Sequence, residues 1–148
     1  MTNYLNQTKD IFNDLQVSFQ EIEMSLDLSH KYVDLSMDIP KQTGLDFDIN
    51  LNLQTDELHI STGFISCSFF PMKDQKIVDL FIESVRGIIN GKYRIVKFLD
   101  KKERLIKSQL QKPENDEWTT VFTDRKKFSL PFAKYRKVII KNTVPNIK

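Results

Sequence analysis

Cysteine, glycine and proline are all scarce in this sequence of 148 residues. Its single cysteine, Cys67, excludes an intramolecular disulfide and suits a reducing compartment. Four glycines and five prolines are too few for a linker-rich or low-complexity chain, whereas 40% hydrophobic residues supply a packed interior. The length also suits one core. We therefore expect a single domain over residues 1–148, with any disorder confined to the last few residues.

Segments that direct a chain to or across a membrane are also lacking. The first ten residues, MTNYLNQTKD, contain neither a basic n-region nor an apolar h-region. No apolar run reaches the roughly 20 residues that a membrane-spanning helix needs. We expect a cytoplasmic protein without membrane contact, and export by a route that leaves no N-terminal signal is the alternative.

Motifs of enzymatic chemistry are missing as well. His30 and His59 stand in no metal-ligand spacing, and the isolated glycines form neither a phosphate loop nor a dinucleotide fingerprint. Cys67 and His59 are eight residues apart on one predicted strand, and at roughly 3.3 Å per residue this places them far beyond hydrogen-bond reach. Asp46 and Asp48 share a strand face, but without further ligands they are typical of a solvated face. We expect no enzyme, no metal and no cofactor; the alternative is a site assembled from residues distant in sequence, which leaves no local motif.

Hydrophobic periodicity predicts an α+β fold with helices on one face of antiparallel strands. Apolar residues at steps of three and four predict a helix over residues 2–29. Alternation of apolar and polar residues then predicts strands over residues 33–39, 45–54 and 58–70. The alternation changes parity beside Gly63, which indicates a β-bulge or bend in the third strand.

A second helix and three further strands are predicted after Pro71. The helix has Asp74 or Lys73 near its start and Gly91 at its C-cap. The strands cover residues 93–100, 104–111 and 118–123. The order α-β-β-β-α-β-β-β is similar to that of small secretion-chaperone-like domains, a likeness of element order alone.

The C-terminal segment and the single tryptophan admit two interpretations each. Ser129 followed by Leu130 and Pro131 favours a C-terminal helix, and an edge strand over residues 135–141 is the alternative. Trp118 shares its strand parity with Phe122, which favours a core position over an interface.

Charge is distributed unevenly along the chain. Residues 1–75 carry 4 Lys and Arg against 12 Asp and Glu, a net charge of −8, whereas residues 76–148 carry 18 against 8, a net charge of +10. An exposed acidic sheet face would attract a basic protein partner, as in an inhibitor or immunity protein that covers a cationic substrate groove. The candidate partner-binding residues are Asp34, Asp38, Asp46 and Asp48.

The uneven charge also fits an internal pairing or a nucleic-acid site. In the first case, the acidic strands pair inside one sheet with basic strands that carry Arg94, Lys97, Arg104 and Lys107. In the second case, the chain binds nucleic acid through a basic stretch interleaved with aromatic residues, although the acidic half opposes a polyanion. The candidate nucleic-acid-binding residues are Arg125, Lys126, Lys127, Lys134, Arg136 and Lys137, and Lys141 continues the basic stretch. The sequence does not predict an oligomeric state.

Overall fold

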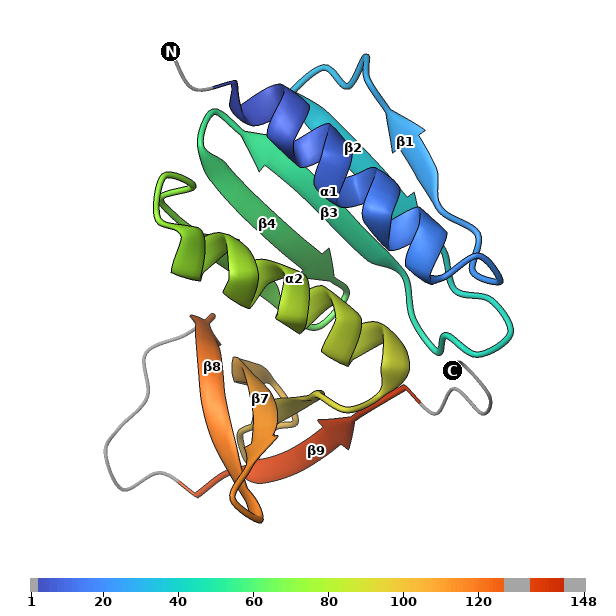
Figure 1. Cartoon of the computed structure of the whole chain (residues 1–148). Helices are drawn as coiled ribbons and strands as arrows, with labels where there is room; N and C mark the ends of the chain where they lie inside the picture. Colours follow the sequence, from blue (N-terminus) through green and yellow to red (C-terminus); the bar gives the residue numbers. More distant parts are fainter. Residues whose placement is uncertain (1–2, 127–133, 143–148) are drawn as a thin grey trace.

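Two antiparallel β-sheets and two α-helices make up the described part of the chain, which confirms the predicted α+β class (Figure 1). The computed structural model describes residues 3–126 and 134–142. The first sheet has the order β1-β2-β3-β4-β5, and its strands are β1 (Ser25–Asp27), β2 (Leu35–Ile39), β3 (Ile49–Gln54), β4 (Glu57–Thr62) and β5 (Ser66–Phe69). The second sheet has the order β8-β7-β6-β9, and its strands are β6 (Arg94–Leu99), β7 (Leu105–Glu114), β8 (Glu117–Arg125) and β9 (Arg136–Ile140).

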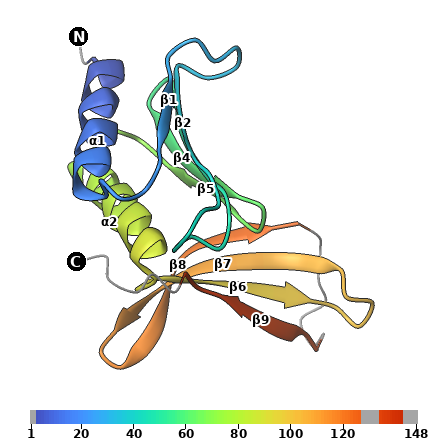
Figure 2. The same cartoon turned by 90° about the vertical axis from the view of Figure 1, so that its right-hand side faces the viewer.

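Helices α1 (Tyr4–Ser18) and α2 (Gln75–Asn90) cover the same face of the first sheet (Figure 2). The Asp74 carboxylate accepts the Lys76 N–H at the start of α2, and Gly91 ends this helix in the left-handed conformation with φ +77°. The sequence predicted Gly91 as the C-cap, and of the two residues predicted near the start, Asp74 and Lys73, the structure has Asp74 as the N-cap. Within the described part of the chain, neither helix combines the length and apolarity that crossing a membrane requires.

The first helix ends at Ser18 and not near residue 29 as predicted. Residues 25–27 pair with β2 instead, with Ser25 opposite Asp38. Ile22 and half-buried Leu26 continue the apolar spacing of α1, but they pack against the core from a turn and a strand. Because both structures can bury the same apolar residues, the helical period did not reveal where the helix ends.

The predicted third strand, residues 58–70, is two strands and not one bulged strand. The chain reverses after Thr62, and β4 and β5 pair antiparallel with Ser61 opposite Ser66. The Thr62 hydroxyl accepts the N–H groups of Phe64 and Ile65 at 3.0 and 3.1 Å and so stabilises the turn. The parity change beside Gly63 therefore marks a hairpin turn.

The described C-terminal segment is an edge strand, so the favoured helix is wrong and the alternative is correct. Strand β9 pairs antiparallel with β6, with Ile95 opposite Ile140 and Leu99 opposite Arg136. The helix was predicted to begin at Ser129, which lies outside the described residues, as do residues 143–148. The free edge of β6 accounts for the strand, because pairing there satisfies backbone groups of both segments.

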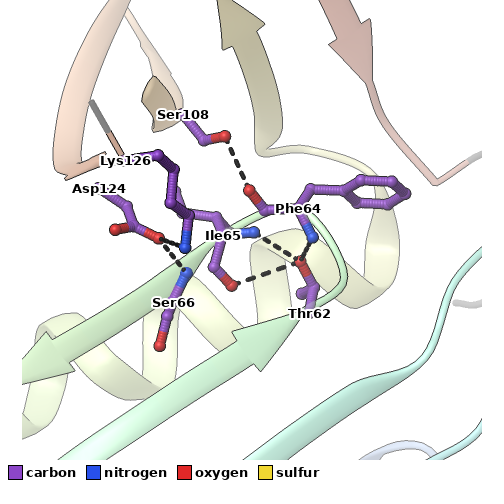
Figure 3. A network of polar contacts seen from close by, with 7 residues as sticks. All are labelled: Thr62, Phe64, Ile65, Ser66, Ser108, Asp124 and Lys126. Carbon is purple, nitrogen blue, oxygen red and sulfur yellow. Dashed lines mark hydrogen bonds and ion pairs between the residues drawn. The ribbon is translucent and has the colours of Figure 1, made fainter. Parts of the chain in front are cut away.

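The turn between β4 and β5 joins the two sheets (Figure 3). The Ser108 hydroxyl of β7 donates to the Phe64 carbonyl at 2.7 Å, and the Ser66 N–H donates to the Asp124 carboxylate of β8 at 2.9 Å. The buried cluster beneath the helices also includes Ile95 and Leu110 of the second sheet. Apolar packing therefore continues from one sheet to the other.

Candidate binding surfaces

The outer face of the first sheet, on the side away from the helices, is polar. Along β3, the side-chain amide of Gln54 donates to Asn52 at 3.2 Å, and that of Asn52 donates to Asn50 at 3.0 Å. The Asn50 amide donates onward to Asp38 and to Ser36 of β2 at 2.8 and 2.9 Å. This row of hydrogen bonds fixes the side chains and makes the face a rigid surface of amides, hydroxyls and carboxylates.

A hollow of about 420 Å³ lies at one end of this face, and we call it the acidic hollow. Asp38 and Asp48 line it together with Asn50, Ser61 and Thr62. The Asp48 carboxylate accepts the Lys41 backbone N–H at 2.7 Å, and Asp38 accepts the Asn50 amide. Among the described residues, no Lys or Arg side chain forms an ion pair with either carboxylate.

The other two candidate aspartates lie elsewhere. Asp34 precedes β2 at the end opposite Asp38, and its carboxylate accepts the Thr55 N–H at 2.7 Å. Thr55 has φ +60°, so this bond supports a strained turn. Asp46 is exposed before β3, and its backbone N–H donates to the Asn142 side chain at 2.8 Å. The structure therefore brings Asp38 and Asp48 together and leaves Asp34 and Asp46 apart from them.

The acidic and basic strands do not pair within one sheet, so that interpretation of the charge asymmetry is wrong. Arg94, Lys97 and Lys107 belong to the second sheet, and Arg104 forms an ion pair with nearby Asp100 at 2.8 Å. The reason is topological, because β7 and β9 occupy both edges of β6 and leave it no edge for the acidic strands.

The second sheet turns one face away from the helices and the first sheet (Figure 2), and the strand register places basic side chains on this face. The strand register places Phe98 opposite Lys107 on one side and Lys137 on the other, and it places Lys107 opposite Arg125. No strand position on this side holds an Asp or Glu in the described register. We call it the basic face, and its charged and aromatic members are Arg94, Lys107, Arg125, Lys137, Lys141, Phe98, Trp118 and Tyr135.

The basic stretch predicted from the sequence contributes only part of this face, namely Arg125, Lys137 and Lys141. Lys126 lies 3.1 Å from Asp124 at the junction of the sheets, and Arg136 pairs with Glu103, which raises the pKa of Arg136. Lys134 is exposed before β9, and Lys127 lies outside the described residues. Sequence reasoning missed Arg94 and Lys107 as members of this face, because strand pairing assembles it from four separate segments.

Trp118 lies on the basic face and not in the core as predicted. A β-bulge in β8 places Phe122 opposite Leu110 but Thr120 opposite Gln111, so one extra residue separates the two pairs. That residue reverses the side on which Trp118 lies relative to Phe122. The Arg94 guanidinium carbon lies 4.1 Å from the centre of the Trp118 ring, and 37% of the residue is exposed.

Neither Cys67 nor His59 belongs to a reactive cluster in the described part of the chain. Cys67 is fully buried, and burial, reinforced by the charge of Asp124, raises the pKa of its thiol to about 12. The thiol is therefore protonated near neutral pH and is a poor nucleophile. His59 lies 3.3 Å from Glu57. Residues 3–126 and 134–142 contain no group of three His, Cys, Asp or Glu side chains placed to hold a metal ion.

Comparisons of the chain with protein-family models, with curated proteins and with solved structures find no match. The acidic hollow and the basic face therefore carry the functional inferences.

Proposed function

We propose that this protein is a small non-enzymatic cytoplasmic binding protein that docks a basic protein partner on the outer face of its first sheet. The acidic hollow carries the proposal. It holds Asp38 and Asp48 side by side in a concavity, and no described Lys or Arg of the same chain neutralises them. A lysine or arginine side chain of a partner would enter the hollow and pair with both carboxylates.

The hydrogen bonds around the hollow favour such a contact. The Lys41 N–H and the Asn50 amide hold one oxygen of each carboxylate in place, so little side-chain freedom is lost on binding. The helices cover the opposite face of the sheet and leave this one open to a partner (Figure 2). The net charge of −8 on residues 1–75 would also speed the encounter with a cationic surface.

The chemistry of this face favours an inhibitor or immunity type over a chaperone type. A chaperone that holds unfolded chains needs exposed apolar surface, whereas the side chains here are amides, hydroxyls and carboxylates such as Asn52, Ser61 and Asp38. Carboxylates on a rigid surface imitate phosphates, so a cationic substrate groove of a toxin that cuts nucleic acid is the kind of surface that fits.

The test compares two double variants of equal charge. Asp38→Asn with Asp48→Asn keeps both hydrogen-bond acceptors in the hollow and removes only the two charges. Asp10→Asn with Asp14→Asn removes two exposed charges from α1, on the covered side of the sheet. Binding of a fluorescent peptide of alternating glycine and arginine is followed by anisotropy at several salt concentrations. We expect the first variant to weaken binding roughly 10-fold, since each pair contributes up to about 1 kcal/mol, and to flatten the salt dependence.

The α1 variant is expected to change the affinity less than about 2-fold, because its charges lie away from the docking surface. Equal losses in the two variants would mean that the peptide senses only the overall charge of the protein. Unchanged binding in the hollow variant would remove the acidic hollow from the interface and, with it, the proposal.

A further inference from the structure

We propose that the basic face binds single-stranded nucleic acid, with Trp118 stacking on a base and the surrounding Arg and Lys side chains contacting phosphates. This site is on the other sheet from the acidic hollow and has the opposite charge, so it goes beyond the proposed function and does not depend on it. The two surfaces would let one small protein hold a basic protein and a polyanion at the same time.

The charges of the basic face repel one another in the absence of a ligand. Lys107 lies directly opposite Arg125, and Lys107 and Lys137 approach the same Phe98 ring from neighbouring strands, at 4.6 and 5.4 Å from its centre. Like charges on directly paired strand residues destabilise a sheet. Among the described residues, none of the five Arg and Lys side chains of this face forms an ion pair. A phosphate backbone would relieve this repulsion on binding.

Trp118 supplies a stacking surface beside these charges. Trp118 is exposed, and the guanidinium of Arg94 lies over its indole ring. The same guanidinium donates to the Gln111 side chain at 2.8 Å. Lys141 lies 5.8 Å from the centre of the same ring. Phe98 is buried beneath the lysines and does not offer a comparable ring. A base that stacks on the exposed part of the Trp118 ring would therefore lie within reach of two cations.

The combination of aromatic and polar groups favours a single strand over other polyanions. Beside Trp118 the face presents Gln109, Gln111 and Thr120, whose amides and hydroxyl can bond to base edges. In a duplex the base faces are stacked inside and cannot reach Trp118. An anionic membrane would be attracted by charge alone, and the stacking surface would then have no role.

Trp118 is the only tryptophan, so intrinsic fluorescence reports directly on this site. The full chain is titrated with an oligothymidylate of about 12 nucleotides, with the corresponding duplex, and with vesicles of phosphatidylserine and phosphatidylcholine. We expect the oligothymidylate to quench the fluorescence and to bind more tightly than the other two. Trp118→Ala should weaken its binding, measured by anisotropy, roughly 5-fold to 150-fold, whereas Trp118→Phe should retain most of the affinity.

Two charge variants of equal size test the phosphate contacts. Lys137→Gln with Lys141→Gln removes two cations from the basic face, and Lys73→Gln with Lys76→Gln removes two exposed cations at the start of α2. The slope of log affinity against log salt should fall by about 1.4 in the first variant and stay unchanged in the second. Asp38→Asn with Asp48→Asn should leave oligothymidylate binding intact.

Three results would overturn the assignment. The first is the absence of oligothymidylate binding, and the second is tighter binding of the duplex or the vesicles. The third is oligothymidylate binding that Trp118→Ala leaves unchanged, or that the two double lysine variants weaken equally. Either outcome would mean that the protein attracts the strand by its overall charge and has no stacking site.

Discussion

Asn142 joins the second sheet to the first, and its substitution tests how strongly the two sheets depend on each other. Its side chain is buried, with 2% of the residue exposed. The amide donates to the Ile88 carbonyl at 2.9 Å, in the last turn of α2, and the side-chain oxygen accepts the Asp46 N–H at 2.8 Å, just before β3. One residue that follows β9 therefore caps the end of α2 and anchors the chain that enters the first sheet.

The expected cost of Asn142→Ala follows from these two bonds. The Ile88 carbonyl would be left buried without a partner, which costs about 1 to 3 kcal/mol, and the partly buried Asp46 N–H would lose a bond worth about 1 kcal/mol. We expect the free energy of unfolding to fall by about 2 to 4 kcal/mol. For a chain of this size, such a loss lowers the melting temperature by roughly 4 to 16 °C.

Urea unfolding measures this cost with two probes, namely far-ultraviolet circular dichroism for the whole chain and Trp118 fluorescence for the second sheet. The unfolding transitions recorded by the two probes should coincide, because the buried cluster continues from one sheet to the other. Asn6→Ala, an exposed site on α1, is the control and should change stability by less than about 0.5 kcal/mol. A loss below about 0.5 kcal/mol in Asn142→Ala, or a second sheet that unfolds separately in the unmodified protein, would refute this view of the junction.

Two further predictions concern Gly91 and Cys67. Gly91→Ala should lower the free energy of unfolding by more than about 2 kcal/mol, because φ is +77° and the new Cβ would lie 1.9 Å from the Asn142 carbonyl oxygen. Gly63→Ala is the control: its Cβ would meet no atom within 4 Å, so stability in the same urea assay should hardly change. Burial raises the pKa of the Cys67 thiol from 9.0 to about 12, so folding favours the protonated thiol and its contribution to stability is lost as pH rises above 9.0. Relative to Cys67→Ala, the unmodified protein should lose about 1.4 kcal/mol between about pH 8 and pH 10, and equal pH dependence in the two would contradict the burial of the thiol.

Caps and hydrophobic spacing predicted helices and strands best where the spacing of apolar residues suited only one of the two structures. Gly91 ends α2 as predicted, with Asp74 at its start, and alternation of apolar and polar residues marked β2 and β3. Prediction failed at residues 25–27 and in the C-terminal segment, where the same apolar residues suit a helix or a strand. Both segments are strands because they pair with β2 and with β6. The spacing of residues within a segment does not show which distant strand it will pair with.

The sequence likewise predicted some residues of the candidate sites and missed others. Alternation correctly placed Asp38 among the outward polar residues of its strand, but the hollow that joins it to Asp48 depends on the pairing of β2 to β4. The basic stretch was visible in the sequence, yet ion pairs with Asp124 and Glu103 engage Lys126 and Arg136, and strand pairing adds Arg94 to the basic face.

The sequence by itself determined the α+β class, the caps of α2 and the separation of negative charge in residues 1–75 from positive charge in residues 76–148, because these depend on the order and spacing of neighbouring residues. Only the tertiary structure decided that the two charges lie on separate sheets, that Asp38 and Asp48 meet in a hollow, and that a single β-bulge turns Trp118 out onto the basic face. Those outcomes depend on which strands pair and in which register, and a shift of one residue moves a side chain from the core to the surface.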